Sequence, residues 1–329
     1  MDVRVRTALV TGAGGFIGSH LVERLLSDGW RVKAFVRYSS HDQHGALVHA
    51  AAGVLDQVDL VPGDLRDGDV VRRAVEDCDA VLHLGAVIAI PYSYTAPRDV
   101  VETNVLGTLN VLEAARVCGT PRVVHTSTSE VYGTAQQLRI DESHPLQGQS
   151  PYSASKIGAD KLAEAYHLSF GLPVVTLRPF NTYGPRQSPR AVIPTILGQA
   201  LAGGQIRLGS LAPTRDFTYV TDTVAAFALA ASAPGIEGQV VHLGTGIEVS
   251  IADVVRIAGE VLGRDLDVVV DDTRLRPPAS EVQRLLSDPT RANELLGWTP
   301  EVSFEAGLRQ TAAWLEQARG WFRLPGYAV

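Results

Sequence analysis

Short apolar runs alternate with longer segments of helical periodicity through the first half of the chain. The apolar runs predict strands at 7–11, 32–36, 58–61, 80–84, 122–127 and 174–178. Apolar positions spaced by three or four residues predict helices at 15–27, 99–117 and 153–170. Strands and helices that alternate in this way form a parallel sheet with helices on both faces. We therefore expect an α/β fold built on a doubly wound parallel sheet.

The pattern loosens after residue 178, where proline and glycine become frequent and the elements shorten. The remaining periodicity predicts helices at 191–202, 220–232, 251–262, 289–296 and 304–316, and a strand at 239–243. We expect residues 1–178 to form the doubly wound domain and residues 179–329 to form a smaller α/β lobe. This lobe would close over the C-terminal edge of the sheet, and part of 220–243 would return to the main sheet.

The composition excludes several classes of function. The net charge of −7 gives no sign of the basic surface that binding to nucleic acid requires. The two cysteines, Cys78 and Cys118, have no paired spacing, so we expect no disulfide scaffold and no metal site. This use of cysteine suits a protein of the reducing cytoplasm. The longest apolar stretch, 80–90, is shorter than the ~20 residues that span a bilayer. The chain also leads straight into its first strand, so we expect no signal peptide and no membrane partner.

A glycine-rich turn joins the first strand to the first helix. Gly12 permits a tight turn, Gly15 lets the backbone approach a pyrophosphate, and Gly18 allows the helix to pack on the sheet. The amino end of the helix, with Phe16 and Ile17, then faces the phosphate charge. A glycine motif in this strand–turn–helix context predicts a Rossmann-like dinucleotide-binding domain.

The end of the second strand bears on which nicotinamide cofactor is bound. No acid stands in residues 35–40 to hold a ribose 2′-hydroxyl, whereas Arg37 and Ser39 could hold a 2′-phosphate. We therefore expect NAD(P), with NADP favoured over NAD, although Arg37 could instead be a solvated side chain that stacks on adenine. Asp64 and Leu65, after the third strand, either contact the adenine edge or, in the case of Asp64, cap a helix.

A phenol and an ammonium lie four residues apart on a predicted helix, at Tyr152 and Lys156. This spacing puts both on one face, one turn apart, so that Lys156 could lower the pKa of Tyr152 and make it a base near neutral pH. Thr128, at the end of the preceding strand, offers a hydroxyl that could share a proton with the phenol. Glu130 adds a carboxylate that a simple alcohol dehydrogenase would not need.

These motifs resemble those of the extended short-chain dehydrogenase/reductases that act on nucleotide sugars. The resemblance rests on the glycine turn, on Thr126-Ser127-Thr128-Ser129-Glu130-Val131-Tyr132-Gly133, on the Tyr152–Lys156 pair, on Asn104 within 102–108, on residues 178–181 and 214–217, and on Arg276-Pro277. Residues 88–94, 145–152 and 184–194 are similar to the GDP-N-acetylglucosamine 4,6-dehydratases of the legionaminic-acid route. The resemblance implies a Rossmann domain, a C-terminal lobe for the nucleotide-diphosphate sugar, a tightly bound NAD(P), and a homodimer formed through helices 99–117 and 153–170.

The resemblance also assigns roles to individual residues. Tyr152 would be the catalytic base, Lys156 would bind the nicotinamide ribose, and Thr128 would bond the 4-hydroxyl of the sugar. The cofactor site would comprise Gly12, Gly15, Phe16, Ile17, Gly18, Arg37, Ser39, Asp64, Leu65, Leu84, Gly85, Ala86, Asn104, Thr126, Tyr152, Lys156 and Pro179. The substrate site would comprise Ser93, Thr128, Ser129, Glu130, Asn181, Val192, Arg215 and Arg276, with the two arginines on the pyrophosphate.

The choice of reaction turns on Glu130. A 4,6-dehydratase oxidises C4, removes the C5 proton, expels the C6 hydroxyl and returns hydride to C6, so it needs a carboxylate such as Glu130. A 4-epimerase shares the first step and needs no further base. Ser129 stands where many dehydratases keep an acid, and UDP-glucuronate decarboxylases share the Thr-Ser-Glu-Val-Tyr-Gly string. We expect a 4,6-dehydratase, with a 4-epimerase as the alternative, and a decarboxylase or a non-catalytic cofactor-binding regulator as lesser ones.

Overall fold

A seven-stranded parallel sheet forms the centre of the computed structural model, which describes residues 4–39, 44–275 and 278–318. Every pair of neighbouring strands is parallel. From one edge to the other the strands are β10 (Val240–Leu243), β6 (Val174–Pro179), β5 (Val123–Thr126), β4 (Ala80–His83), β1 (Thr7–Thr11), β2 (Arg31–Arg37) and β3 (Val58–Gly63). The order reverses beside β1, where the two halves of a doubly wound sheet meet, so the predicted Rossmann-like α/β class is confirmed.

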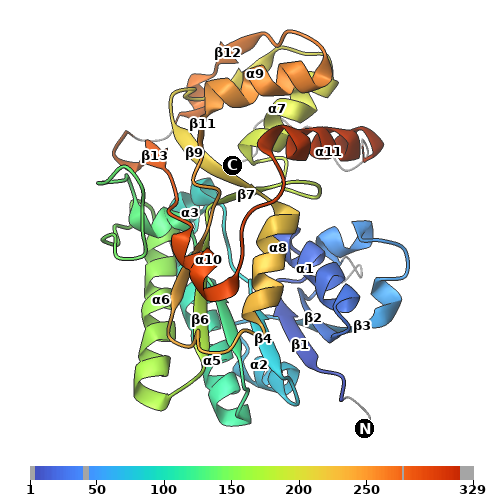
Figure 1. Cartoon of the computed structure of the whole chain (residues 1–329), viewed down its shortest axis with the longest axis vertical. Coiled ribbons are helices and arrows are strands. Elements are labelled where there is room, and N and C mark those ends of the chain that lie inside the picture. Colours follow the sequence, from blue (N-terminus) through green and yellow to red (C-terminus); the bar gives the residue numbers. More distant parts are fainter. Residues whose placement is uncertain (1–3, 40–43, 276–277, 319–329) are drawn as a thin grey trace.

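Helices cover both faces of this sheet (Figure 1). Along β1, Ala8 and Val10 pack in one buried cluster, and Leu9 between them packs in another, as the two-residue period of a strand requires. The helices on the Leu9 side are α2 (Gly68–Val75), α5 (Gly107–Cys118) and α6 (Pro151–Phe170). The helices on the other side are α1 (Phe16–Ser27) and α8 (Val220–Ala230), which pack against each other.

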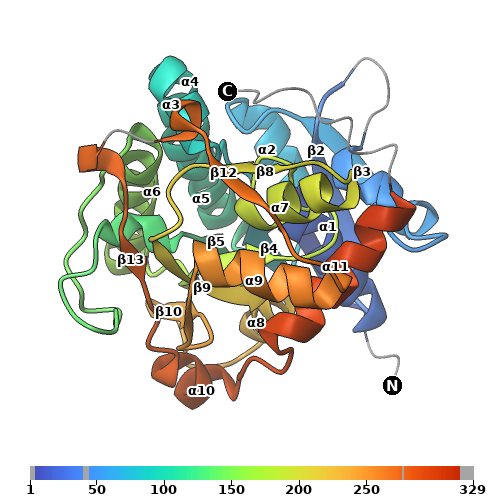
Figure 2. The ribbon, with the colours of Figure 1, turned by 90° about the horizontal axis from the view of Figure 1, so that it is seen from above.

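A second group of elements lies beyond the C-terminal edge of the main sheet, at the top of Figure 1 and facing the viewer in Figure 2. The strand β9 (Thr214–Tyr219) pairs with β7 (Asn181–Tyr183), β11 (Glu248–Ser250) and β13 (Arg284–Leu285). A two-stranded sheet joins β8 (Ile206–Leu208) to β12 (Val268–Val270). The helices here are α7 (Val192–Leu201), α9 (Ile251–Leu262) and α11 (Phe304–Gln317), and α10 (Thr290–Leu296) packs beside β10 and α8.

The chain does not divide cleanly at residue 178. The edge strand β10 pairs with β6, and α8 lies on α1, so the segment between 220 and 243 contributes to the main layer. Residues beyond this segment return to the second group, with β11, α9 and β12. The boundary between 178 and 179 as a functional domain limit stays a prediction.

Several elements differ from the pattern that the sequence predicts, and two of them lie in helical regions of the first half of the chain. The expected helix at 99–117 is interrupted: α4 (Pro97–Val101) is followed by a π-helical turn, η3 (Glu102–Leu106), and only then by α5. The helix α2 was not expected, because it is only eight residues long. It begins at Gly68 because the Asp67 carboxylate accepts hydrogen bonds from the amides of Asp69 and Val70.

The helix α6 has strong signals at both ends. Pro151 occupies its first turn, and Ser150 and Ser153 form a reciprocal capping box. Gly171 ends the helix in a left-handed conformation, with φ of 65°. These signals fix the register of the helix that carries Tyr152 and Lys156. Within the described ranges, no helix has the length and apolar character needed to cross a bilayer.

Candidate active site

The glycine turn after β1 leaves open backbone at the amino end of α1. Gly12 has φ of +70°, and a Cβ atom there would lie 2.8 Å from the amide nitrogen of Gly85. Gly15 is the residue before α1 and has no side chain that could cap the first amides of that helix. These N–H groups and the positive end of the helix suit the pyrophosphate of a dinucleotide.

Gly18 has a different packing partner from the one that the sequence suggests. A Cβ atom there would lie 2.1 Å from the carbonyl oxygen of Gly12 and 3.0 Å from Cα of Ala13. The close approach is therefore between the helix and its own preceding loop, not between the helix and the sheet. Phe16 and Ile17, in the first turn of α1, are half-buried and pack on the large hydrophobic cluster.

A buried polar group fixes the loop after β4, which holds the predicted cofactor residues Leu84, Gly85 and Ala86. The Thr11 hydroxyl accepts the amide of Gly85 at 3.0 Å and lies 2.8 Å from Nδ1 of His83. The other ring nitrogen of His83 lies 3.0 Å from Oγ1 of Thr108 on α5. Burial lowers the pKa of His83 well below its usual value, so the ring is neutral and serves to hold this loop beside Gly12.

Asn104 ties the same loop to the helix of the Tyr–Lys pair. Its side chain is 1 % exposed, accepts the amide of Val87 at 2.7 Å and donates to the Val87 carbonyl at 3.0 Å. It also donates to Oγ of Ser155 on α6 at 2.9 Å. Both N–H groups of the amide are thus used within the protein, whereas Oδ1 has a second lone pair that could accept a hydrogen bond from the cofactor.

Tyr152 and Lys156 lie against the C-terminal end of β5. Nζ of Lys156 donates to the carbonyl oxygen of Thr126, the last residue of that strand, at 2.6 Å. The Tyr152 hydroxyl is within hydrogen-bonding reach of the Thr128 side chain. Four of the predicted site residues, Thr126, Thr128, Tyr152 and Lys156, are therefore brought together, although they come from two separate elements.

Burial has the largest effect on the pKa values of Tyr152 and Lys156. Burial is the largest effect on Tyr152 and raises its pKa above the usual value, the hydrogen bond with Thr128 opposes this rise, and the charge of Glu130 adds to it. Burial also lowers the pKa of Lys156 to about 8. Desolvation dominates the pKa of the phenol here and the Lys156 ammonium is bonded to Thr126, so the lowering of the Tyr152 pKa by Lys156 stays a prediction.

Glu130 lies in the short 3₁₀ helix η4 (Ser129–Tyr132) that follows Thr128. The Thr128 hydroxyl accepts the backbone amide of Glu130 at 3.2 Å and so starts this turn. The Glu130 carboxylate is half-buried, and no hydrogen-bond donor or cation in the described part of the chain binds it. A carboxylate close enough to raise the pKa of Tyr152, and without a partner of its own, can accept a proton from a ligand. Ser129 beside it is buried.

The residues predicted at the adenosine end lie on β2, β3 and the loops after them. Arg37 ends β2 and is exposed, and Ser39 is half-buried. Asp64 binds Arg66, with Oδ2 2.6 Å from its guanidinium, and this bond keeps the pKa of Asp64 below its usual value. Asp64 does not cap α2, because Asp67 does. Leu65 is buried, and it occupies the space that a Cβ atom on Gly85 would need.

The residues predicted to hold the sugar nucleotide differ in how they are placed. Asn181, which begins β7, has a buried Oδ1 with no hydrogen-bond partner, as expected for a group that awaits a ligand. Pro179, predicted for the cofactor site and not for the sugar nucleotide, is buried at the end of β6. Arg215 lies in β9, donates to the Thr214 carbonyl at 2.9 Å, and is 3.5 Å from the Glu281 carboxylate.

Three further residues of the predicted substrate site are Ser93, Val192 and Arg276, and their role there stays a prediction. Ser93 is 0 % exposed and donates its hydroxyl to the Ile90 carbonyl at 2.7 Å, within α3 (Ile90–Thr95), so it would reach a ligand only if this helix shifted. Val192 is the half-buried first residue of α7. Arg276 lies outside the described residues.

Sequence reasoning missed a buried polar cluster directly behind the Tyr–Lys pair. Asp160, one turn beyond Lys156 on α6, binds the side chains of His125 on β5, Ser127 just after β5 and Arg178 on β6. The four-residue spacing from Lys156 to Asp160 was a visible signal. The partners were not, since they depend on which strands pack under the helix.

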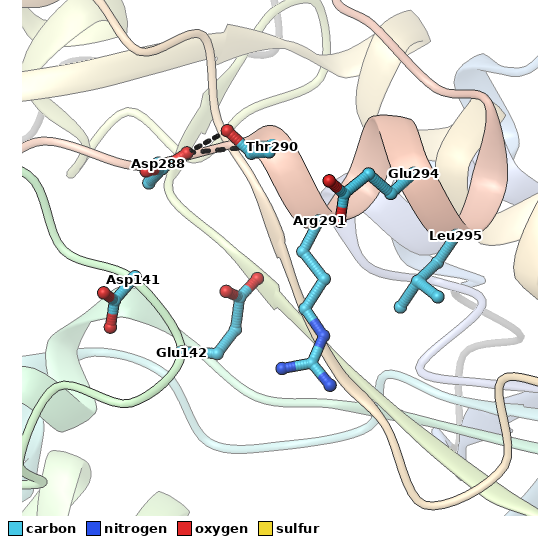
Figure 3. Close-up of a pocket in the computed structure, with 7 residues that line it drawn as sticks. All are labelled: Asp141, Glu142, Asp288, Thr290, Arg291, Glu294 and Leu295. Atoms are coloured by element: carbon cyan, nitrogen blue, oxygen red, sulfur yellow. Dashed lines mark hydrogen bonds between the residues drawn. The ribbon is translucent and has the colours of Figure 1, made fainter.

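A cavity of about 420 Å³ lies elsewhere, between the loop at 141–142 and α10 (Figure 3). Its lining includes the carboxylates of Asp141, Glu142, Asp288 and Glu294, and the side chain of Arg291 extends from α10 alongside Glu142. None of the predicted site residues lines this cavity. An acidic surface of this kind suits neither a pyrophosphate nor a dinucleotide, and the predicted site stays at the glycine turn and the Tyr–Lys pair.

Comparison with known proteins gives a consistent family. The model of the family described as GDP-mannose 4,6 dehydratase matches residues 9–311. A UDP-glucose 4-epimerase from Mycolicibacterium smegmatis is 36% identical over 311 residues, which cover 92% of this chain and 96% of that protein. A dTDP-glucose 4,6-dehydratase from Streptomyces antibioticus is 34% identical over 319 residues, which cover 95% of this chain and 93% of that protein.

Solved structures agree with the sequence matches. The dTDP-glucose 4,6-dehydratase DesIV from Streptomyces venezuelae, solved with NAD bound, superposes with a TM-score of 0.84 at 34% identity and covers 96% of this chain and 99% of its own. A UDP-N-acetylglucosamine 4-epimerase from Methanobrevibacter ruminantium superposes with a TM-score of 0.87 at 29% identity, covering 96% and 100%. The chain therefore belongs to the GDP-mannose 4,6-dehydratase-like family of extended short-chain dehydrogenase/reductases, the enzymes that dehydrate or epimerise nucleotide sugars.

Proposed function

We propose that the protein is an NAD(P)-dependent NDP-sugar 4,6-dehydratase that keeps its cofactor through each turnover. Relatives of both the dehydratase and the epimerase type match the chain, so family membership alone does not decide between these reactions. The observation that favours dehydration is the Glu130 carboxylate, which lies near Tyr152 without a partner among the described residues. An epimerase has no use for this group, whereas a dehydratase needs a base for the C5 proton.

The first chemical task of the site is to remove the proton of the C4 hydroxyl. Tyr152 would accept this proton, and Thr128, which shares a hydrogen bond with the phenol, would polarise the same oxygen. Lys156, bonded to the Thr126 carbonyl, would hold the nicotinamide ribose and orient the site. The nicotinamide, when bound at the glycine turn, would accept the hydride from C4 and later return it to C6.

The second task is elimination. A ketone at C4 acidifies the C5 proton, and Glu130 would take this proton while the C6 hydroxyl leaves as water. Tyr152 and Glu130 together collect two protons. One leaves with the C6 hydroxyl and the other returns to C5, so the product is the substrate less one water. Ser129 offers no carboxylate beside Glu130, so Glu130 is the acid and base for this step.

The direct test is to incubate the purified protein with a panel of NDP-sugars and to identify the product by mass and by its alkaline absorbance. We expect a 6-deoxy-4-keto sugar with the mass of the substrate less one water. An epimeric sugar of unchanged mass would instead establish the alternative, a 4-epimerase, which the 36% identity to an epimerase and the presence of Ser129 keep as the second candidate.

The finer choice of cofactor is also a proposal. We expect NADP, because the described end of β2 offers Arg37 and Ser39 and no carboxylate to a ribose 2′-position. The cofactor released from the denatured protein identifies this directly by mass. Release of NAD alone would contradict the proposal, as would an Arg37→Ala variant that retains undiminished preference for NADP.

For the substrate we propose a GDP-linked N-acetylhexosamine first, because residues 88–94, 145–152 and 184–194 are similar to dehydratases that act on such sugars. A panel that matches the sugar across GDP, UDP and dTDP tests the nucleotide separately. We also propose a homodimer through the outer faces of α5 and α6, which light scattering would detect. Exposed apolar side chains on these helices are Val117, Leu168 and Phe170, and Val101 on α4 and Leu106 on η3 precede α5. We expect the protein in the cytoplasm, where Cys78 and Cys118 would stay reduced.

A further inference from the structure

A carboxylate is buried directly behind the Tyr152–Lys156 pair. Asp160 is 5 % exposed and follows Lys156 by four residues on α6, so the two side chains lie on one face of the helix. Its Oδ2 accepts the Ser127 hydroxyl at 2.6 Å and a guanidinium N–H of Arg178 at 2.9 Å. Its Oδ1 lies 3.0 Å from Nε2 of His125. These partners belong to β5, its C-terminal extension and β6, so the carboxylate joins the helix to the sheet.

The charges around Asp160 do not cancel. Asp160 carries one negative charge, while Arg178 and Lys156 each carry a positive one. Burial lowers the pKa of His125, which therefore adds no charge, and burial raises the pKa of Tyr132, the other partner of Arg178, to about 12. Around Asp160 one positive charge is therefore in excess, whereas the charges that act on Tyr152 itself are those of Asp160 and Glu130, both negative.

We propose that Asp160 is a positioning residue that shares its negative charge between Arg178 and Lys156, and so sets the charge balance of the Tyr152–Lys156 pair. The carboxylate keeps the ammonium of Lys156 charged in a buried place. Its negative charge also acts on Tyr152 directly and raises the pKa of the phenol. The hydrogen bonds to Ser127 and Arg178 fix the distance of α6 from the strand end that carries Thr126 and Thr128.

Other charged groups near α6 do not compete for this role. Glu130, from η4, acts on Tyr152 from the ligand side, and His83, from β4, is neutral because burial lowers its pKa. The helices on the outer side of α6 present carboxylates that are partly exposed and already paired. They are Asp99 with Arg66 and Tyr92, Glu102 with Arg98, and Glu113 with Arg116 and Tyr166.

The proposal makes a signed prediction for the pH dependence of kcat/KM. One limb reports loss of the Tyr152 proton and the other reports loss of the Lys156 proton, and a nearby negative charge holds both protons more tightly. Removal of the Asp160 charge therefore moves both limbs toward lower pH. Removal of the Arg178 charge leaves Asp160 less neutralised and moves both limbs toward higher pH.

The experiment compares Asp160→Asn and Arg178→Gln with the wild-type holoenzyme, on whichever sugar nucleotide the wild type oxidises at C4. We expect shifts of about 1 pH unit in opposite directions. Arg178→Lys keeps the charge and should leave both limbs in place. Asp222→Asn is the matched control. Asp222, on α8, is also buried, but it accepts the backbone amide of Val302, away from the site. It should lower stability without moving either limb.

The proposal fails if Asp160→Asn loses activity while both limbs stay at the wild-type pH, since that is the signature of a purely structural role. If Asp160→Asn does not fold, Arg178→Gln alone decides, and limbs that stay in place or move toward acid would overturn the proposal. The inference rests on the proposed function only in taking Tyr152 as the base. Dehydratases and epimerases share the C4 oxidation, so an epimeric product would refute the proposed dehydration and leave this test intact.

Discussion

The contact between Gly18 and the glycine turn gives the sharpest prediction for cofactor binding. In Gly18→Ala the new Cβ would lie 2.1 Å from the Gly12 carbonyl oxygen, whereas Cβ contacts under 3.0 Å essentially never occur. The loop and helix must therefore move apart by about 0.9 Å, the difference of these two distances. Overpacking of this kind costs about 1–3 kcal/mol of stability.

The same movement displaces the amides that would meet the pyrophosphate. Hydrogen bonds to charged acceptors need about 2.7–2.9 Å, so a shift of nearly 1 Å breaks them. Loss of two such bonds, at about 1.5–3 kcal/mol each, would weaken cofactor binding by about 3–6 kcal/mol. This corresponds to a loss of affinity of at least roughly a hundredfold.

The assay is calorimetric titration of cofactor into the apoprotein, together with the cofactor content of the protein as purified. Gly204→Ala is the matched control, because a Cβ atom there would have no neighbour within 4 Å. This control should bind as the wild type does. A Gly18→Ala variant that folds and binds cofactor with wild-type affinity would refute the reasoning, since the loop would then have absorbed the clash without disturbing the phosphate site.

Three further predictions follow from the site. Glu130→Gln should retain C4 oxidation, seen as reduced nicotinamide, and lose about 10²–10⁴-fold in formation of the dehydrated product, whereas equal loss of both steps would contradict its role as the C5 base. Asn104→Ala should lower the free energy of unfolding by about 3 kcal/mol, from three lost bonds, against about 1 kcal/mol for the control Asn110→Ala, which loses one bond to Leu65; equal losses in denaturant titrations would count against the assignment. Between pH 8 and about 10, the free energy of unfolding should rise with pH more steeply in the wild type than in Lys156→Met, because the pKa of folded Lys156 is lowered to about 8 while the unfolded chain keeps its proton up to about 10.5; identical slopes would contradict this.

Local sequence patterns predict the two elements that carry the chemistry, the glycine turn and the helix of Tyr152 and Lys156. The glycine spacing at 12, 15 and 18 predicts a turn that needs a positive φ, and Gly12 has one. The spacing of Tyr152 and Lys156 predicts that both lie on one face of a helix, and α6 provides it. Strand–helix alternation predicts the parallel order, because a crossover helix leaves few other topologies.

What the sequence could not predict depends on contacts between distant segments. The strands of the small sheet, such as β13 with two residues, are too short to show a period. The π-helical turn η3 contains Asn104, whose side-chain amide binds the Val87 backbone in the loop after β4, and this long-range contact is not visible in the sequence. The bond from Lys156 to the Thr126 carbonyl, and the resulting electrostatics, require knowledge of which strand end faces α6.

The return of β10 to the edge of the main sheet limits how this enzyme can be recombined with its relatives. A chimera with a single junction near residue 179 would pair a foreign β10 with the native β6, and would place a foreign α8 on the native α1. Two buried contact surfaces would then be mismatched, because the exchanged piece carries α8 and β10 along with the intended substrate lobe. Transfer of nucleotide specificity between relatives would therefore need at least two further junctions, on either side of 220–243, so that the native segment stays with its own sheet.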